Sequence, residues 1–345
     1  MTENSFDLSG LADALPQEAA RWLESIGVGS ADFSDLFQVS FRDVLEGIAG
    51  IFRNDLHEPL RFLCAACGVL LLLTAASAIG GQDGKAGEVR DFACALLLVT
   101  ACALPLQGIA ARSVAALKAV GGCVTALIPV LAAVTAASGS PVLSVCWQTA
   151  LFSAAQTVTA AASGFMAPCC GLMLGTGVLD CLLPDSGFGE VSRRLRKTAV
   201  WIFSALATLF TAFLSLKGVL AVSADTLSAK GVRLLIGSFV PVIGAQLSEA
   251  YASVIGTLQA ARSTAGVFAI AAICAVALPA LCRLVLWQAA LEGTKLLSDL
   301  LGHKAAGDLF RAFSGALSVL LGCLLFVTEL YVLSVGIILV LKGGV

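Results

Sequence analysis

The sequence predicts an all-α, polytopic integral membrane protein with about seven to eight transmembrane helices and further amphipathic helices at the membrane surface. Composition gives the first reason: 58% of the 345 residues are hydrophobic and 13% are charged, whereas about a quarter of a soluble domain is charged. The second reason is that long stretches contain no charged residue. About 20 such residues cross a hydrocarbon core of about 30 Å.

Composition also excludes several classes of function. The net charge is -2 and acids and bases are mixed along the chain, whereas a nucleic-acid-binding protein needs a basic surface. Most of the 12 cysteines lie singly in apolar runs, and they form no ligand set with zinc spacing. We therefore expect no nucleic acid, no metal and no cofactor. The first residues, MTENSFDLSG, do not resemble a signal peptide.

Residues 1–58 are predicted to be an N-terminal, non-spanning region, followed by a polytopic helical membrane domain at 59–345. The N-terminal region contains two stretches with apolar residues at helical spacing, which is typical of helices lying on a surface. These apolar residues are Leu11, Leu15, Trp22, Leu23 and Ile26, then Leu36, Val44, Leu45, Ile48, Ile51 and Phe52.

The first two spans are expected at 62–80 and 92–111, which contain no charged residue and are separated by a charged loop. A short basic connection is expected from Arg112 to Lys118. The next 61 residues, 119–179, contain no charge and are long enough for three crossings. Glycine, serine and proline favour breaks near 138–141 and 163–164. Helices are therefore expected at 119–137, 143–163 and 165–183.

The second half continues with a basic loop at 184–197 and a span at 198–216. The basic cluster from Arg193 to Lys197 favours the cytoplasm and hence an outside N-terminus, although Lys and Arg are otherwise evenly divided between the two sides. The segment 217–262 is mixed and is expected to be an irregular element, re-entrant or interfacial. Further spans are expected at 263–282 and 316–341, with one amphipathic helix between them.

Glu329 is unusual because it lies near the middle of the last expected span. An ionised carboxylate there is costly, so it should face protein or water. Two interpretations stay open. Glu329 belongs to an ion pathway or pairs with a charge on a neighbouring subunit, or it is a neutral or hydrogen-bonded carboxyl at a helix contact.

The sequence GSFVPVIG, from Gly237 to Gly244, is the second unusual element. Two glycines and a proline in eight residues disfavour a regular helix, and a membrane tolerates such backbone only where protein covers it or water reaches it. The element is interpreted either as a loop at a pore or subunit contact or as a tight turn before a surface helix. Candidate residues for the pore or subunit contact are Asp225, Lys230, Gly237, Ser238, Phe239, Pro241, Gly244 and Glu329.

At this element the sequence resembles the stage III sporulation protein AE family. The block GSFVPVIG, then LSEA from Leu247 and VIG from Val254, is similar to the family's most characteristic block. The residues SLKG from Ser215, with Asp225 and Lys230, resemble the segment before it. The resemblance extends from about residue 40 to the C-terminus.

The resemblance implies a multi-pass subunit in the mother-cell membrane around the forespore. It would join other small membrane proteins, a separate ATPase and a forespore-side partner in a channel complex that supports late forespore development. Two departures from the family pattern are the missing signal sequence and Lys217, where glutamine is common.

No ATP-binding glycine loop, zinc-protease pair or nucleophile elbow occurs in the sequence. We therefore expect a non-enzymatic membrane subunit of a sporulation channel or secretion-like complex. The alternative is a stand-alone secondary transporter or permease, which favours an internal repeat and paired broken helices.

Overall fold

The computed structural model describes residues 41–79, 85–137, 141–183, 187–206, 208–210, 212 and 244–340. The described residues are almost entirely helical. In chain order the elements are α3 (Phe41–Asp55), α4 (His57–Ile79), α5 (Lys85–Ala137), α6 (Pro141–Ala160), the π-helix η2 (Ala161–Met166), α7 (Ala167–Leu182), an unlabelled helix at 188–206, α9 (Gly244–Leu300) and α10 (Lys304–Val340).

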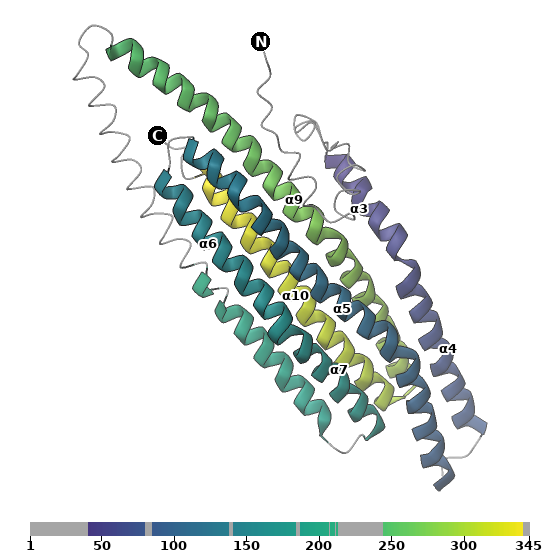
Figure 1. Cartoon of the computed structure of the whole chain (residues 1–345). Coiled ribbons are helices and arrows are strands. Elements are labelled where there is room, and N and C mark those ends of the chain that lie inside the picture. Colours follow the sequence, from purple (N-terminus) through teal and green to yellow (C-terminus); the bar gives the residue numbers. More distant parts are fainter. Residues whose placement is uncertain are drawn as a thin grey trace.

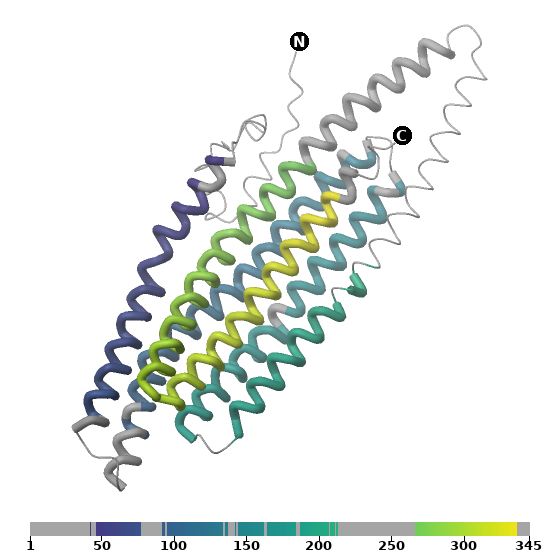
Figure 2. Tube along the Cα trace, turned by 180° about the vertical axis from the view of Figure 1, so that it is seen from behind, coloured from purple at the N-terminus to yellow at the C-terminus, as the bar shows by residue number. Residues whose placement is uncertain are grey.

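The helices lie side by side along one long axis (Figure 1). α5 has 53 residues and α9 has 57, which correspond to about 80 and 85 Å at a rise of 1.5 Å per residue. α10 packs against α9, α7, α5 and α6. α3 and α4 follow one another along one side of α9 (Figure 2).

Five helices among the described residues are long and apolar enough to cross a membrane, so the chain is a multi-pass membrane protein. The apolar parts of α5 and α9 have 39 and 35 residues, well beyond the roughly 20 residues that a bilayer requires. The apolar stretches are His57–Ala76, Ala95–Ala133, Ser144–Leu182, Gly266–Leu300 and Lys304–Gly336.

Several spans that were expected to be separate helices are parts of one continuous helix. The basic connection predicted from Arg112 to Lys118 is wrong, because these residues are helical within α5. The break predicted near 138–141 agrees with the end of α5 at Ala137 and the start of α6 at Pro141, a helix start that suits the fixed φ of proline. At 163–164 the chain does not turn back but continues through η2 into α7.

The single amphipathic helix predicted between the last two spans is also wrong. α9 ends at Leu300 and α10 begins at Lys304, and Gly302 between them has a φ of 77°, which glycine adopts without steric cost. Residues 244–262 form the start of α9, so a helix follows the GSFVPVIG block, whereas the irregular element expected at 217–262 does not extend into these residues. Residues 217–243 of that expected element lie outside the described residues.

The core runs through the bundle from α4 to α10, and the contact between α9 and α10 is its most extensive part. Small residues dominate the α9 side, and Ala269, Ala272 and Ala275 are fully buried. α10 contributes large side chains, including Phe310, Phe313 and Tyr331. Small residues on one helix allow the backbones to approach closely, which is how helices associate where lipid replaces water.

Candidate functional site

Of the residues expected at the functional site, Gly244 and Glu329 lie in the described part of the chain. Gly244 is the first residue of α9, and Glu329 belongs to α10. The others lie outside it: Asp225, Lys230, Gly237, Ser238, Phe239 and Pro241. Their roles at a pore or subunit contact therefore stay predictions.

The side chain of Glu329 is exposed on the outer side of α10. Leu325 and Leu333, one turn before and after it, are 50% and 52% exposed. Glu329 makes no hydrogen bond or ion pair with any residue that the structure describes. An ionised carboxylate in the middle of a bilayer costs about 2.5 to 3.5 kcal/mol, and the role of Glu329 at a pore or subunit contact stays a prediction.

A polar network joins α9 to α10. Gln288 Nε2 donates hydrogen bonds to Ser314 Oγ at 2.6 Å and to Ser318 Oγ at 3.0 Å. Ser314 Oγ in turn donates to Glu292 Oε1 at 2.8 Å, and Lys295 Nζ lies 3.0 Å from Glu292 Oε2. Sequence analysis missed this network, although the spacing of four residues between Gln288 and Glu292, and between Ser314 and Ser318, places each pair on one helix face.

The first of two polar crevices lies between α4, α5 and α9 and has a volume of about 460 Å³. At its mouth Arg112 Nη1 of α5 donates to Glu58 Oε2 of α4 at 2.9 Å. Arg61 also lines the crevice, and Trp287 of α9 forms part of its wall. The indole N–H of Trp287 is buried and has no hydrogen-bond partner among the described residues.

The second crevice, also about 460 Å³, lies between α7, the helix at 188–206 and α10. Asp180 Oδ1 accepts a hydrogen bond from the backbone N–H of Gly189 at 2.8 Å. Arg311 pairs with Asp308 on α10, and Arg196 Cδ lies 3.6 Å from where a Cβ on Gly315 would stand. Its charged side chains are three bases and three acids: Arg193, Arg196, Arg311, Asp180, Glu190 and Asp308.

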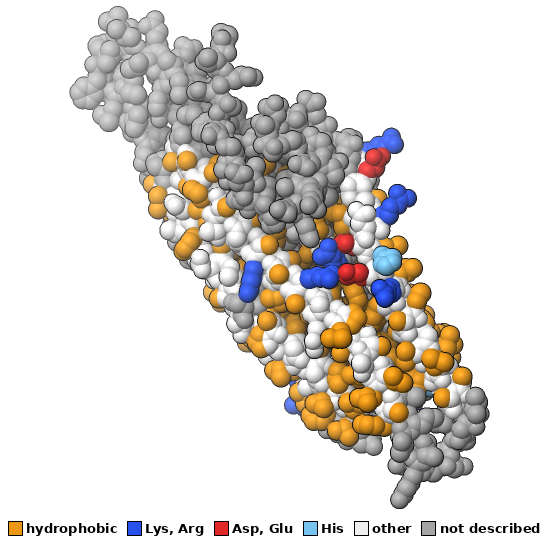
Figure 3. All heavy atoms as spheres, turned by 45° about the vertical axis from the view of Figure 1, so that its right-hand side comes forward, with side chains coloured by type: hydrophobic (Ala, Val, Ile, Leu, Met, Phe, Trp, Pro, Cys, Tyr) orange, Lys and Arg blue, Asp and Glu red, His pale blue; other side chains and the backbone are white. Residues whose placement is uncertain are grey.

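The polar network connects the two crevices. Trp287 lines the first crevice and precedes Gln288, while Gly315 lines the second and follows Ser314. On the face shown in Figure 3, most of the charged side chains lie along one side of the molecule beside a broad area of hydrophobic side chains, and single basic groups lie apart from them. Polar groups of α9 and α10 therefore lie between the two crevices, and further along α5 and α10 the helix surfaces carry few charges.

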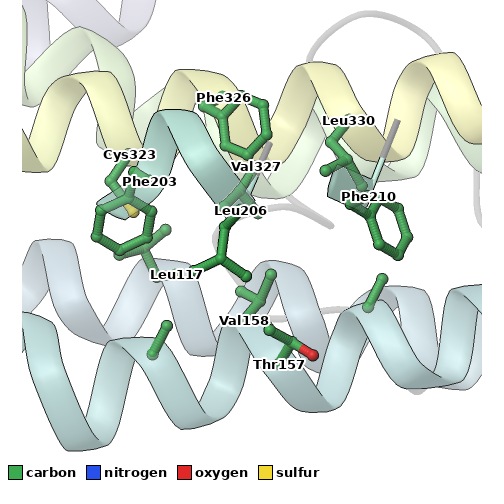
Figure 4. A pocket seen from close by; sticks show the side chains of 12 residues that line it. Leu117, Thr157, Val158, Phe203, Leu206, Phe210, Cys323, Phe326, Val327 and Leu330 are labelled. Carbon is green, nitrogen blue, oxygen red and sulfur yellow. The ribbon is translucent and has the colours of Figure 1, made fainter. Parts of the chain in front are cut away.

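Nearer the C-terminal end of α10, an apolar pocket of about 50 Å³ lies between α5, α6, the helix at 188–206 and α10. Phe203, Leu206 and Phe326 point into it, with Thr157 at its edge (Figure 4). This pocket can accept an apolar group such as part of a lipid chain. The polar contacts described above include no adjacent nucleophile and base of the kind that nucleophilic catalysis requires.

Comparisons with known proteins agree on one family. The family model described as stage III sporulation protein AE matches residues 31–342. The chain is 23% identical over 167 residues to the stage III sporulation protein AE of Bacillus subtilis (strain 168), an alignment that covers 48% of this chain and 42% of that relative. No solved structure matches the chain.

Proposed function

The chain belongs to the stage III sporulation protein AE family, and from this premise we propose that it is a non-enzymatic membrane subunit of a sporulation-specific channel. This channel, or secretion-like complex, links the mother cell with the forespore and is needed for late forespore development. The observation that carries the proposal is the family match over residues 31–342, which includes every described helix.

The architecture supports a role in assembly rather than catalysis. Continuous helices such as α5 and α9 are tied to their neighbours by Glu58–Arg112 and by the hydrogen bonds of Gln288. Such cross-helix contacts make a rigid body with a fixed outer surface. A rigid subunit with an extensive apolar surface suits a complex in which other proteins supply energy.

In this proposal the protein lies in the mother-cell membrane that surrounds the forespore. Its partners are other small membrane proteins of the complex, a separate ATPase and a protein on the forespore side. The number of crossings, expected to be seven to eight, stays a prediction, because α5 alone contains two expected spans. A helix as long as α5 crosses the bilayer only once if the half of it on one side of Arg112 lies outside the bilayer.

The alternative is a stand-alone secondary transporter or permease. Such a transporter favours two corresponding broken helices that form a midplane site. Within the described ranges, η2 interrupts α-helical geometry between α6 and α7, whereas α5, α9 and α10 continue without such a break. This asymmetry favours the subunit of a larger complex.

The test is an in-frame deletion of the gene in its own spore-forming host, with a plasmid copy for complementation. We expect engulfment to proceed, forespore-specific late gene expression to fail, and the tagged protein to be recovered from detergent extracts together with other membrane proteins of the complex. A deletion strain with normal late expression and normal spores contradicts the proposal. Solute uptake by the purified protein alone in liposomes supports the transporter.

A further inference from the structure

Lys118 on α5 and Glu329 on α10 lie at the same depth in the bundle. Leu117, the residue before Lys118, lines the apolar pocket of Figure 4 together with Val327 and Leu330, which are two residues before and one residue after Glu329. The helices share one long axis (Figure 2), so residues beside one small pocket occupy one level.

These two opposite charges are isolated in the apolar part of the described chain. Lys118 is the one charged residue at 113–137 of α5, and α6, η2 and α7 contain none before Asp180. Glu329 is the one charged residue at 312–340 of α10. The neighbouring segments 198–206 and 266–282 are uncharged.

Both side chains are exposed. Neither forms an ion pair or a hydrogen bond with the residues that the structure describes, so the two do not compensate each other within one chain. A pair of isolated, opposite charges on the outer surface of an apolar bundle calls for partners that bring the complementary charge to the same depth.

We propose that the surface around Lys118 binds the surface around Glu329 of a second copy of this chain within the membrane. All copies of one membrane protein have the same orientation, so opposite charges on two copies meet only if their depths agree. Lys118 and Glu329 meet this condition. This inference does not depend on the role in sporulation.

The shapes of the two surfaces are complementary. The exposed residues of α5 one turn before and after Lys118 are small, namely Ala115 and Gly122. Beside Glu329, exposed leucines of α10 project outward. Small residues let another helix approach closely, and the leucines supply the bulk that fills the space. Since each copy uses two different surfaces, repeated pairing builds a ring where the rotation closes.

The experiment reconstitutes full-length chain into liposomes as a mixture of ¹⁵N-labelled and unlabelled protein, and treats it with a lipid-soluble carbodiimide, which joins a lysine amine to a carboxylate in contact. We expect a denaturant-stable dimer, and mass spectrometry should find the Lys118–Glu329 link between labelled and unlabelled chains. Lys118→Gln and Glu329→Gln should each abolish the linked dimer.

Charge reversal separates pairing from misfolding. Lys118→Glu and Glu329→Lys should each abolish the dimer, whereas the double variant should restore it. Lys197→Gln changes a lysine outside this apolar layer and should leave the dimer intact. The proposal is overturned if the link forms only within one chain, if neutral variants that insert normally keep the dimer, or if the inserted double variant stays monomeric.

Discussion

Arg283 of α9 forms an ion pair with Asp55 at the end of α3, with 3.1 Å between Arg283 Nη2 and Asp55 Oδ2. The side chains are only 19% and 24% exposed, and the residues are 228 positions apart in the chain. The pair therefore fixes the amphipathic N-terminal helix to the central helix of the bundle.

Removing one partner of this pair should destabilise the protein. Asp55→Asn leaves a largely buried guanidinium without its counter-charge, which we expect to cost about 2 to 4 kcal/mol. Thermal unfolding of the purified chain in detergent measures the change. Glu46→Gln is the matched control, because the Arg42–Glu46 pair is exposed on both sides and should change stability by less than about 1 kcal/mol. If Asp55→Asn and Glu46→Gln lower the stability equally, the Arg283–Asp55 pair does not stabilise the fold in the way described.

Ser314→Ala removes the hydroxyl that connects Gln288 with Glu292. We expect a loss of about 0.5 to 2 kcal/mol, the range found for helix-to-helix hydrogen bonds in membranes. Ser153→Ala serves for comparison, because Ser153 donates only to the carbonyl of Ala150 in its own helix. Unfolding in detergent reports both. If the Ser314 variant is as stable as the Ser153 variant, the polar network does not stabilise the packing of α9 against α10.

Two glycines of α7 should respond in opposite directions to alanine. A Cβ on Gly177 would lie 2.7 Å from the Cβ of Ala312 in α10, whereas a Cβ on Gly175 meets nothing within 4 Å. Gly177→Ala should therefore destabilise the bundle by about 1 to 3 kcal/mol. Gly175→Ala should stabilise it by up to about 1 kcal/mol, because alanine favours the helix. The measurement is the melting temperature, which should fall for Gly177→Ala and rise for Gly175→Ala.

Gly237→Leu and Gly244→Leu should disrupt complex formation or sporulation more than Cys170→Ser does. The reason is that a large side chain alters a backbone segment rich in glycine and proline, whereas Cys170 behaves as a small buried residue in α7. Spore counts and co-purification from the complemented host provide the measurement. If all three variants behave like the wild type, the GSFVPVIG segment is not part of the proposed contact.

The sequence predicted the helical membrane class but misplaced several connections, among them the one at 112–118. Arg112 and Lys118 looked like a loop because charges normally mark the ends of spans. The surrounding residues are good helix formers, and Glu58 supplies a counter-charge to Arg112 from α4. Helix propagation depends on local backbone hydrogen bonds, so a charge compensated by another helix does not end α5.

Other features depended on residues far apart in the chain. The hydrogen bonds between Gln288 and Ser314 connect positions 26 residues apart, and no local pattern pairs them. Glu329 was recognised as unusual from its position in an apolar run. That it faces outward at the depth of Lys118 follows only from the packing of α5 beside α10.

By itself, the sequence determined that this chain enters a membrane as helices, because uncharged runs prefer hydrocarbon to water and must satisfy their backbone hydrogen bonds internally. Only the tertiary structure decided which runs join into single helices, which charges are compensated and which remain on the outside. These outcomes depend on distances between side chains of different helices. Such distances follow from how the helices pack, and the hydropathy of the sequence does not contain them.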